Sequence, residues 1–122
     1  MQIEKLEILR SIAEMAYVIA KADKGLSAEE RIAFNKIIGE ELQYDSWAAQ
    51  SRFDLLDEVI QPSIETAYNQ AIHDLRKYKE HLTDNLRSTA IRVVERVAQA
   101  CSGTHEIEAF IIDRFKKDLQ HL

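Results

Sequence analysis

The fold is decided by one short segment between two helical patterns, Ala22-Asp23-Lys24-Gly25-Leu26-Ser27-Ala28-Glu29-Glu30. Gly25 permits a tight turn, because glycine adopts backbone angles that other residues avoid. Ser27 and Glu30 have the spacing of a capping box, in which each side chain binds a backbone amide at the start of a helix. The segment therefore predicts a helical hairpin whose second helix begins at Ser27.

A weaker copy of this segment follows 78 positions later, Ala100-Cys101-Ser102-Gly103-Thr104-His105-Glu106-Ile107-Glu108. The offset places Gly25 on Gly103 and Glu30 on Glu108. Helices match at many offsets because their periods agree, so the shared glycine and glutamate carry the argument. The sequence therefore predicts a degenerate duplication of one helical hairpin.

Apolar residues recur three and four positions apart along most of the chain, which is the spacing of one buried helical face. The pattern and its breaks predict helices over residues 6–23, 27–42, 45–61, 62–78, 83–101 and 104–122. Pro62 ends the third helix and suits the first turn of the fourth, and Thr83 is positioned to cap the fifth. No stretch alternates with period two, so we expect an all-α fold, a compact bundle of six or seven helices forming one domain over residues 1–122.

The same periodicity predicts which side chains point inward. The first helix is expected to bury one face. In the later helices the expected core includes Ile32, Ala33, Ile37, Ile38, Ala49, Phe53, Leu56, Ile60, Ile107, Phe110, Ile111, Phe115, Leu119 and Leu122. Cys101 continues an apolar stripe and is expected to be a buried small hydrophobe. Trp47 is expected to cover the core.

Composition narrows the class of protein. Of the 122 residues, 46% are apolar and 30% are charged, which is typical of a compact domain able to bury a core without metals or disulfides. A single cysteine excludes an internal disulfide and suits a reducing compartment. Charged residues near the N-terminus replace the apolar region of a signal peptide, and no apolar run is long enough to span a bilayer, so we expect a cytoplasmic protein.

Charge is distributed unevenly between the two halves. Residues 1–60 hold 12 acidic and 7 basic residues, whereas residues 61–122 hold 9 of each. An acidic first half favours cations or basic partners and argues against a phosphate-binding surface. We therefore expect a protein partner and no nucleic acid.

The turn segment resembles the signature of the TerB-like family, which is named for tellurite resistance. The usual pattern of that family is Ala-Asp-Gly-x-Leu/Ile-Ser-x-x-Glu, and the matching residues here are Ala22, Asp23, Leu26, Ser27 and Glu30. In this chain the glycine falls one place late, and in the second copy Cys101 stands where the pattern has aspartate. The resemblance implies an all-helical module of bacterial stress systems that associates with membrane complexes and binds metal through acidic residues. It implies no established catalysis.

Asp23 is the first candidate site residue. It continues the apolar stripe of its helix at the C-terminal end, where the helix dipole and partial burial both disfavour a carboxylate. Two explanations remain open. In one, amides that open the next helix donate hydrogen bonds to Asp23, which then fastens the hairpin. In the other, Asp23 and Glu30 hold a divalent cation, together with Glu29 or Glu108.

These observations lead to three functional hypotheses. The first is a non-enzymatic interaction or sensing module of a stress-response system, with a cation bound at the acidic interhelical loop. The others are a divalent-metal-dependent enzyme and a plain structural homodimer. Peripheral membrane association is a further option, since basic residues gather in the fourth and fifth helices: Arg76, Lys77, Lys79, Arg87, Arg92 and Arg96.

Overall fold

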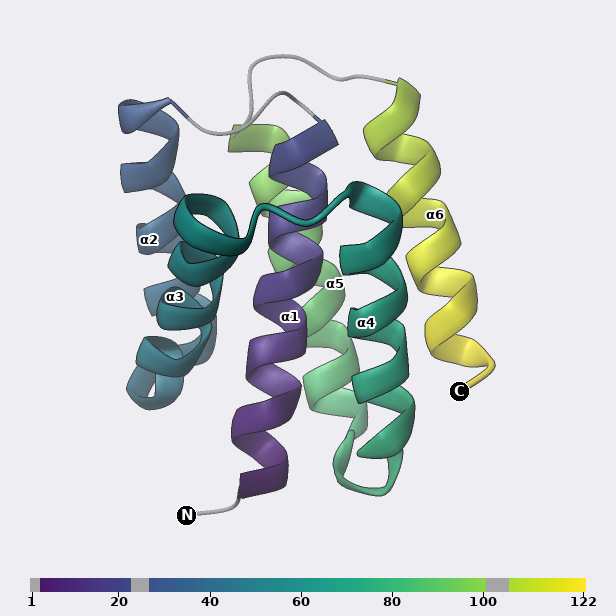
Figure 1. The fold of residues 1–122 in the computed structure, drawn as a ribbon. Helices are drawn as coiled ribbons and strands as arrows, with labels where there is room; N and C mark the ends of the chain where they lie inside the picture. The colour runs from purple at the N-terminus through teal and green to yellow at the C-terminus, as the bar shows by residue number, and fades with distance from the viewer. Residues whose placement is uncertain (1–2, 23–26, 101–105) are drawn as a thin grey trace.

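The computed structural model describes residues 3–22, 27–100 and 106–122, which contain helices and no strand. The predicted all-α class is therefore confirmed. The helices are α1 (Ile3–Ala22), α2 (Ala28–Leu42), α3 (Ser46–Leu55), α4 (Ile64–Lys77), α5 (Asp84–Ala100) and α6 (Glu106–Gln120) (Figure 1). Two 3-10 turns, η1 (Gln43–Asp45) and η3 (Lys79–His81), and one π-helical turn, η2 (Leu56–Ile60), lie between them.

Helix α1 is the centre of the bundle. Figure 1 shows it between α2 and α3 on one side and α4 and α6 on the other, with α5 behind. Every residue from Ser11 to Ala20 is buried, so this helix has no exposed face over nearly three turns. A helix that is apolar all round can be stable only when other elements cover it completely. The prediction of a single buried face for this helix was therefore too narrow.

Aromatic rings fix α2 and α3 against α1. The ring centroids of Phe34 on α2 and Phe53 on α3 are 4.0 Å apart, and Tyr17 on α1 meets Phe53 edge-on at 6.4 Å. All three side chains are almost completely buried. Aromatic pairs of this kind contribute stability beyond the burial of their area.

The capping box at the start of α2 is confirmed. The Ser27 hydroxyl accepts from the Glu30 amide at 3.2 Å, and a Glu30 carboxylate oxygen accepts from the Ser27 amide at 2.9 Å. Thr83 caps α5 as expected, accepting from the Leu86 amide at 3.1 Å. Pro62 precedes α4 and does not lie in its first turn, because Ser63 is the residue that caps that helix.

The prediction that Ile60 points inward with Leu56 was wrong, and the π-helical turn explains why. Ile60 is 55% exposed, whereas Ala49, Phe53 and Leu56 are buried as expected. In η2 the Gln61 amide bonds the Leu56 carbonyl, five residues earlier, at 2.7 Å. The wider turn holds more residues than an α-helical turn, so the residue four places after Leu56 no longer lies on its face.

Four other core predictions were also wrong. Ile32, Ile107, Phe110 and Trp47 are all exposed, by 72%, 51%, 68% and 48%. In α2 the buried face is set by Phe34, Ile37, Ile38 and Leu42. In α6 it is set by Glu108, Ile111, Phe115 and Leu119. Trp47 lies near the Arg10 guanidinium, 5.9 Å from the ring centroid, at the surface.

Cys101 and most of the second copy of the turn segment lie outside the described residues, so their predictions stay predictions. Within the described ranges, no helix combines the length and the apolar character needed to span a bilayer.

We expect Ser27→Ala to lower the free energy of unfolding by about 1 kcal/mol, because the first turn of α2 loses the acceptor for its Glu30 amide. Urea denaturation measures the difference. Ser51→Ala, on an exposed position inside α3, is the control and should change stability little. Equal denaturation midpoints for wild type and Ser27→Ala would contradict a stabilising cap.

Candidate functional site

Glu14 is a buried carboxyl in the middle of α1. The residue is 4% exposed and stands among apolar neighbours on the central helix. Its Oε2 accepts from Arg52 of α3 at 3.2 Å, while its Oε1 is buried and has no hydrogen-bond partner. A buried polar atom without a partner in the protein costs free energy.

The environment of Glu14 makes its charge unfavourable. Burial raises the pKa of this carboxyl to about 7, and the negative charges of Asp74 on α4 and Glu7 on α1 act in the same direction. The Arg52 guanidinium lowers the pKa but does not offset burial. Glu14 therefore exchanges its proton near neutral pH, which is typical of carboxyls at functional sites.

A cavity of about 320 Å³ lies beside Glu14, between α1, α3, η2 and the start of α4. Its walls are mainly apolar, with a few polar side chains among them. The lining residues are Glu14, Arg52, Leu55, Leu56, Ile60, Pro62, Thr66, Ala67 and Gln70. The volume is at the lower end of the range for ligand pockets, which suits one side chain or one small molecule.

Unusual backbone geometry forms one wall of this cavity. The turn η2 is π-helical, and Gln61 after it has a left-handed backbone conformation with φ of 48°. The Tyr17 hydroxyl donates to the Pro62 carbonyl at 2.8 Å and so fixes the linker on α1. π-turns and left-handed non-glycine residues are uncommon and are concentrated at functional sites.

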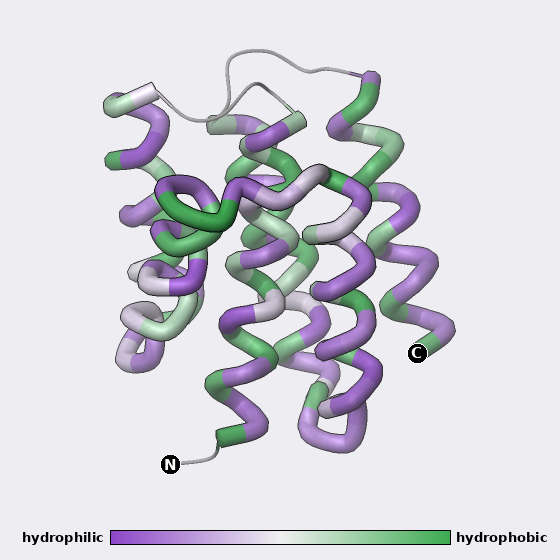
Figure 2. The backbone as a smooth tube through the Cα atoms, viewed as in Figure 1, coloured by the Kyte–Doolittle hydropathy of each residue, from purple (hydrophilic) through white to green (hydrophobic). Residues whose placement is uncertain are grey.

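Apolar side chains are exposed at the mouth of the cavity. Leu55, Val59 and Ile60 are 42%, 71% and 55% exposed, within six consecutive residues. Leu55 and Ile60 both line the cavity, and Val59 adjoins Ile60 in the chain, so we group the three exposed side chains as one patch. Figure 2 colours the end of η2 as hydrophobic, next to a hydrophilic segment of the same turn. We call this patch the α3–η2 surface.

Acidic residues border the α3–η2 surface. Arg31 of α2 pairs with Asp54 at 3.0 Å and with Asp57, and its distance to Glu58 is 4.0 Å. One guanidinium therefore meets three carboxylates, and the side chains of Asp54 and Glu58 remain more than half exposed. With Glu14 and Arg52 included, the region holds four acids and two arginines.

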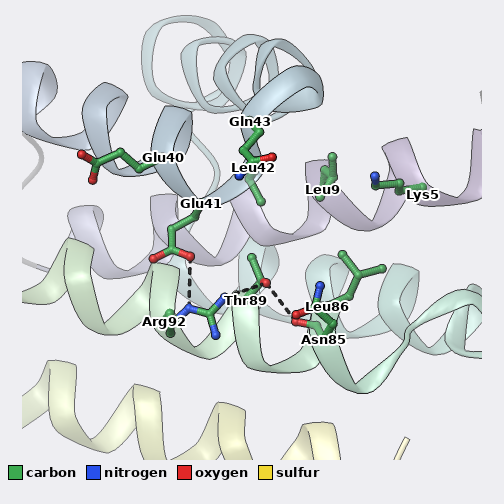
Figure 3. A pocket seen from close by; sticks show the side chains of 10 residues that line it. All are labelled: Lys5, Leu9, Glu40, Glu41, Leu42, Gln43, Asn85, Leu86, Thr89 and Arg92. Atoms are coloured by element: carbon green, nitrogen blue, oxygen red, sulfur yellow. Dashed lines mark hydrogen bonds and ion pairs between the residues drawn. The ribbon is translucent and has the colours of Figure 1, made fainter.

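A second cavity of about 340 Å³ lies between α1, α2 and α5, and Figure 3 shows the side chains that line it. Here the charges are satisfied by one another. Both oxygens of Glu41 accept hydrogen bonds, from Arg92 at 3.1 Å and from Arg96 at 3.2 Å, and Arg92 also donates to Thr89 at 3.1 Å. This network links α2 to α5 and leaves no charge that requires a ligand. Glu14 is the stronger candidate.

The structure describes only some of the predicted site residues. Asp23 lies outside the described residues, and Glu30 caps α2 through its carboxylate. Glu30 and Glu108 begin different helices, α2 and α6, which Figure 1 places on opposite sides of α1. Within the ranges that the structure covers, no three His, Cys, Asp or Glu side chains gather as a metal site would require. A cation held by Asp23 and Glu30 stays a prediction.

Glu14 was not among the predicted site residues, although the sequence contains a signal for it. From Ile12 to Ala20 the chain reads Ile-Ala-Glu-Met-Ala-Tyr-Val-Ile-Ala, in which Glu14 is the one charged residue. A lone acid in an apolar run of helical length is either buried or at a ligand site. Fitting a single inward stripe placed Glu14 on the opposite face, where a charge needs no explanation.

Comparison of the chain with protein-family models, with curated proteins and with solved structures found no match. A functional hypothesis therefore depends on the chemistry of the site.

We expect Glu14→Gln to stabilise the protein at about pH 8 and to leave stability unchanged at about pH 4.5. Because the pKa of Glu14 is raised in the folded protein, its contribution to stability is full below the unfolded value of 4.5 and is lost as the pH rises to about 7. The loss is roughly 3 kcal/mol above that pH. Because glutamine does not ionise, the variant avoids this loss of stability.

Denaturation of both proteins at the two pH values measures this effect. Glu95→Gln is the matched control, since Glu95 also lies 3.2 Å from its partner, Lys116, but is 42% exposed. Its effect should be small at both pH values. A Glu14→Gln gain of the same size at both pH values would show that ionisation of Glu14 is not its cause.

Proposed function

We propose that this protein is a non-enzymatic interaction module whose α3–η2 surface docks a basic, amphipathic helical segment of a partner protein. The observation that carries the proposal is the exposed apolar patch at the mouth of a mainly apolar cavity with an acidic border. Contiguous exposed apolar residues rimmed by polar ones are typical of protein-interaction sites.

The shape of the surface supports an inserted side chain. Leu55 and Ile60 are exposed and also line the cavity, so an apolar group bound there would cover them both. A helical segment can place the aliphatic stem of one long side chain in the cavity and a large apolar side chain, one turn away, against Val59. Helices bind apolar grooves in this way, through anchors three or four residues apart.

The charges favour a basic partner. Asp54 and Glu58 are exposed beside the patch and can pair with lysine or arginine. A second copy of this chain fits less well, because a symmetric dimer would bring the same acidic border against itself. The acidic first half of the chain supports the same choice of partner.

The resemblance to the TerB-like family extends the proposal. On that basis the partner belongs to a cytoplasmic, membrane-associated complex of a bacterial stress response. A duplicated hairpin and a cation held by Asp23 and Glu30 are further parts of this hypothesis.

Selection from a displayed library of random helical peptides tests the docking surface. We expect enriched peptides to carry a large apolar residue with lysine or arginine one turn away. Ile60→Asp should weaken their binding by about tenfold or more, since a charge then faces the apolar anchor. Ile107→Asp on α6 is the matched control, because Ile107 is an isoleucine of nearly equal exposure, 51% against 55%.

Two outcomes would refute the proposal. One is enrichment of peptides whose binding does not depend on Ile60. The other is a dimer of the wild-type chain, seen by sedimentation, that dissociates in Ile60→Asp, because the surface would then bind a second copy.

A further inference from the structure

We propose that the cavity beside Glu14 is a subsite for a primary ammonium group on an aliphatic stem, which displaces the Arg52 guanidinium from Glu14. The source of the ammonium, a lysine side chain of the docked segment, rests on the proposed function. The subsite itself rests on the geometry around Glu14.

Within the described part of the protein, only one of the two Glu14 oxygens takes part in a hydrogen bond. Arg52 donates to Oε2 at 3.2 Å, and Oε1 is buried without a hydrogen-bond partner. The Arg52 guanidinium is planar and donates to only one oxygen of this carboxylate. An ammonium is compact and has three donors, so one group between the two oxygens can donate to both.

The remaining lining matches the rest of such a ligand. Thr66 and Gln70 on α4 also line the cavity, and their side-chain oxygens can accept the third ammonium hydrogen. Leu55, Leu56 and Ile60 provide apolar walls for an aliphatic stem. Burial of that stem supplies a driving force for binding.

The exchange of cations preserves the charge balance of the core. Arg52 leaves and an ammonium enters, so Glu14 keeps one positive partner throughout. The Arg52 side chain is already 27% exposed and can turn toward water, where its charge is well solvated. Entry therefore requires movement of the Arg52 side chain.

Proton uptake competes with the ammonium for Glu14. The charged groups that act on Glu14 are Arg52 from α3, Asp74 from α4 and Glu7 from its own helix, and with burial they leave its pKa at about 7. A cation binds the ionised carboxylate only. Binding should therefore be about thirtyfold weaker at pH 5.5 than at pH 8, following the ionised fraction of a group with this pKa.

Titration of the protein with butylammonium, followed by amide NMR shifts, tests the subsite. Butanol is the neutral probe of nearly the same size. We expect butylammonium at pH 8 to shift amides of residues that line the cavity, and to bind at least tenfold more tightly than butanol. At pH 5.5 the advantage of butylammonium should disappear.

Two variants complete the design. Glu14→Gln should abolish the preference for butylammonium and its pH dependence while retaining the fold. Glu95→Gln removes an exposed, paired carboxyl and should leave both unchanged. Equal binding of butanol and butylammonium to wild type, or unchanged butylammonium binding in Glu14→Gln, would overturn the proposal.

The result is separate from that of the peptide selection. Peptides that need Ile60 but bind Glu14→Gln as tightly as wild type would leave the docking surface in place and overturn the lysine subsite. Selective butylammonium binding without any selected peptide would support the subsite with a free amine as its ligand and would count against the docked protein.

Discussion

The complete burial of α1 from Ser11 to Ala20 is the constraint on which the rest of the structure depends. A helix without an exposed face cannot lie at the edge of a bundle, so the other helices must surround it. Tyr17, Phe34 and Phe53 join three helices at one point of this contact. The same burial raises the pKa of Glu14, because a carboxyl at this position is removed from water whatever its charge.

The irregular segment after α3 follows from the same constraint. Leu56 remains against the core, and the π-helical turn then carries the chain outward to Gln61 and Pro62. Tyr17 holds that linker from α1. A regular helix would have placed Ile60 on the same face as Leu56. The wider turn thus leaves Ile60 exposed, where it lines the cavity.

Sequence patterns predicted the helices and their caps well. Features that depend on packing between helices were harder to predict. Ser27, Glu30 and Thr83 act within one turn of their own position, so their capping roles could be inferred from spacing alone. The exposure of Ile60 depends on a backbone irregularity that no sequence pattern predicts. Glu14 was detectable as a lone acid among apolar residues, but its link to Arg52, 38 positions away, depends on how α1 and α3 pack.

The placement of Glu14 on the central helix also affects how long the empty protein survives. An ionised carboxyl in the core raises the population of opened chains, on which cellular proteases act. A bound cation lowers that population by mass action. If the proposed ammonium binds there, cellular abundance of this protein should follow its supply, with the unoccupied chain degraded first.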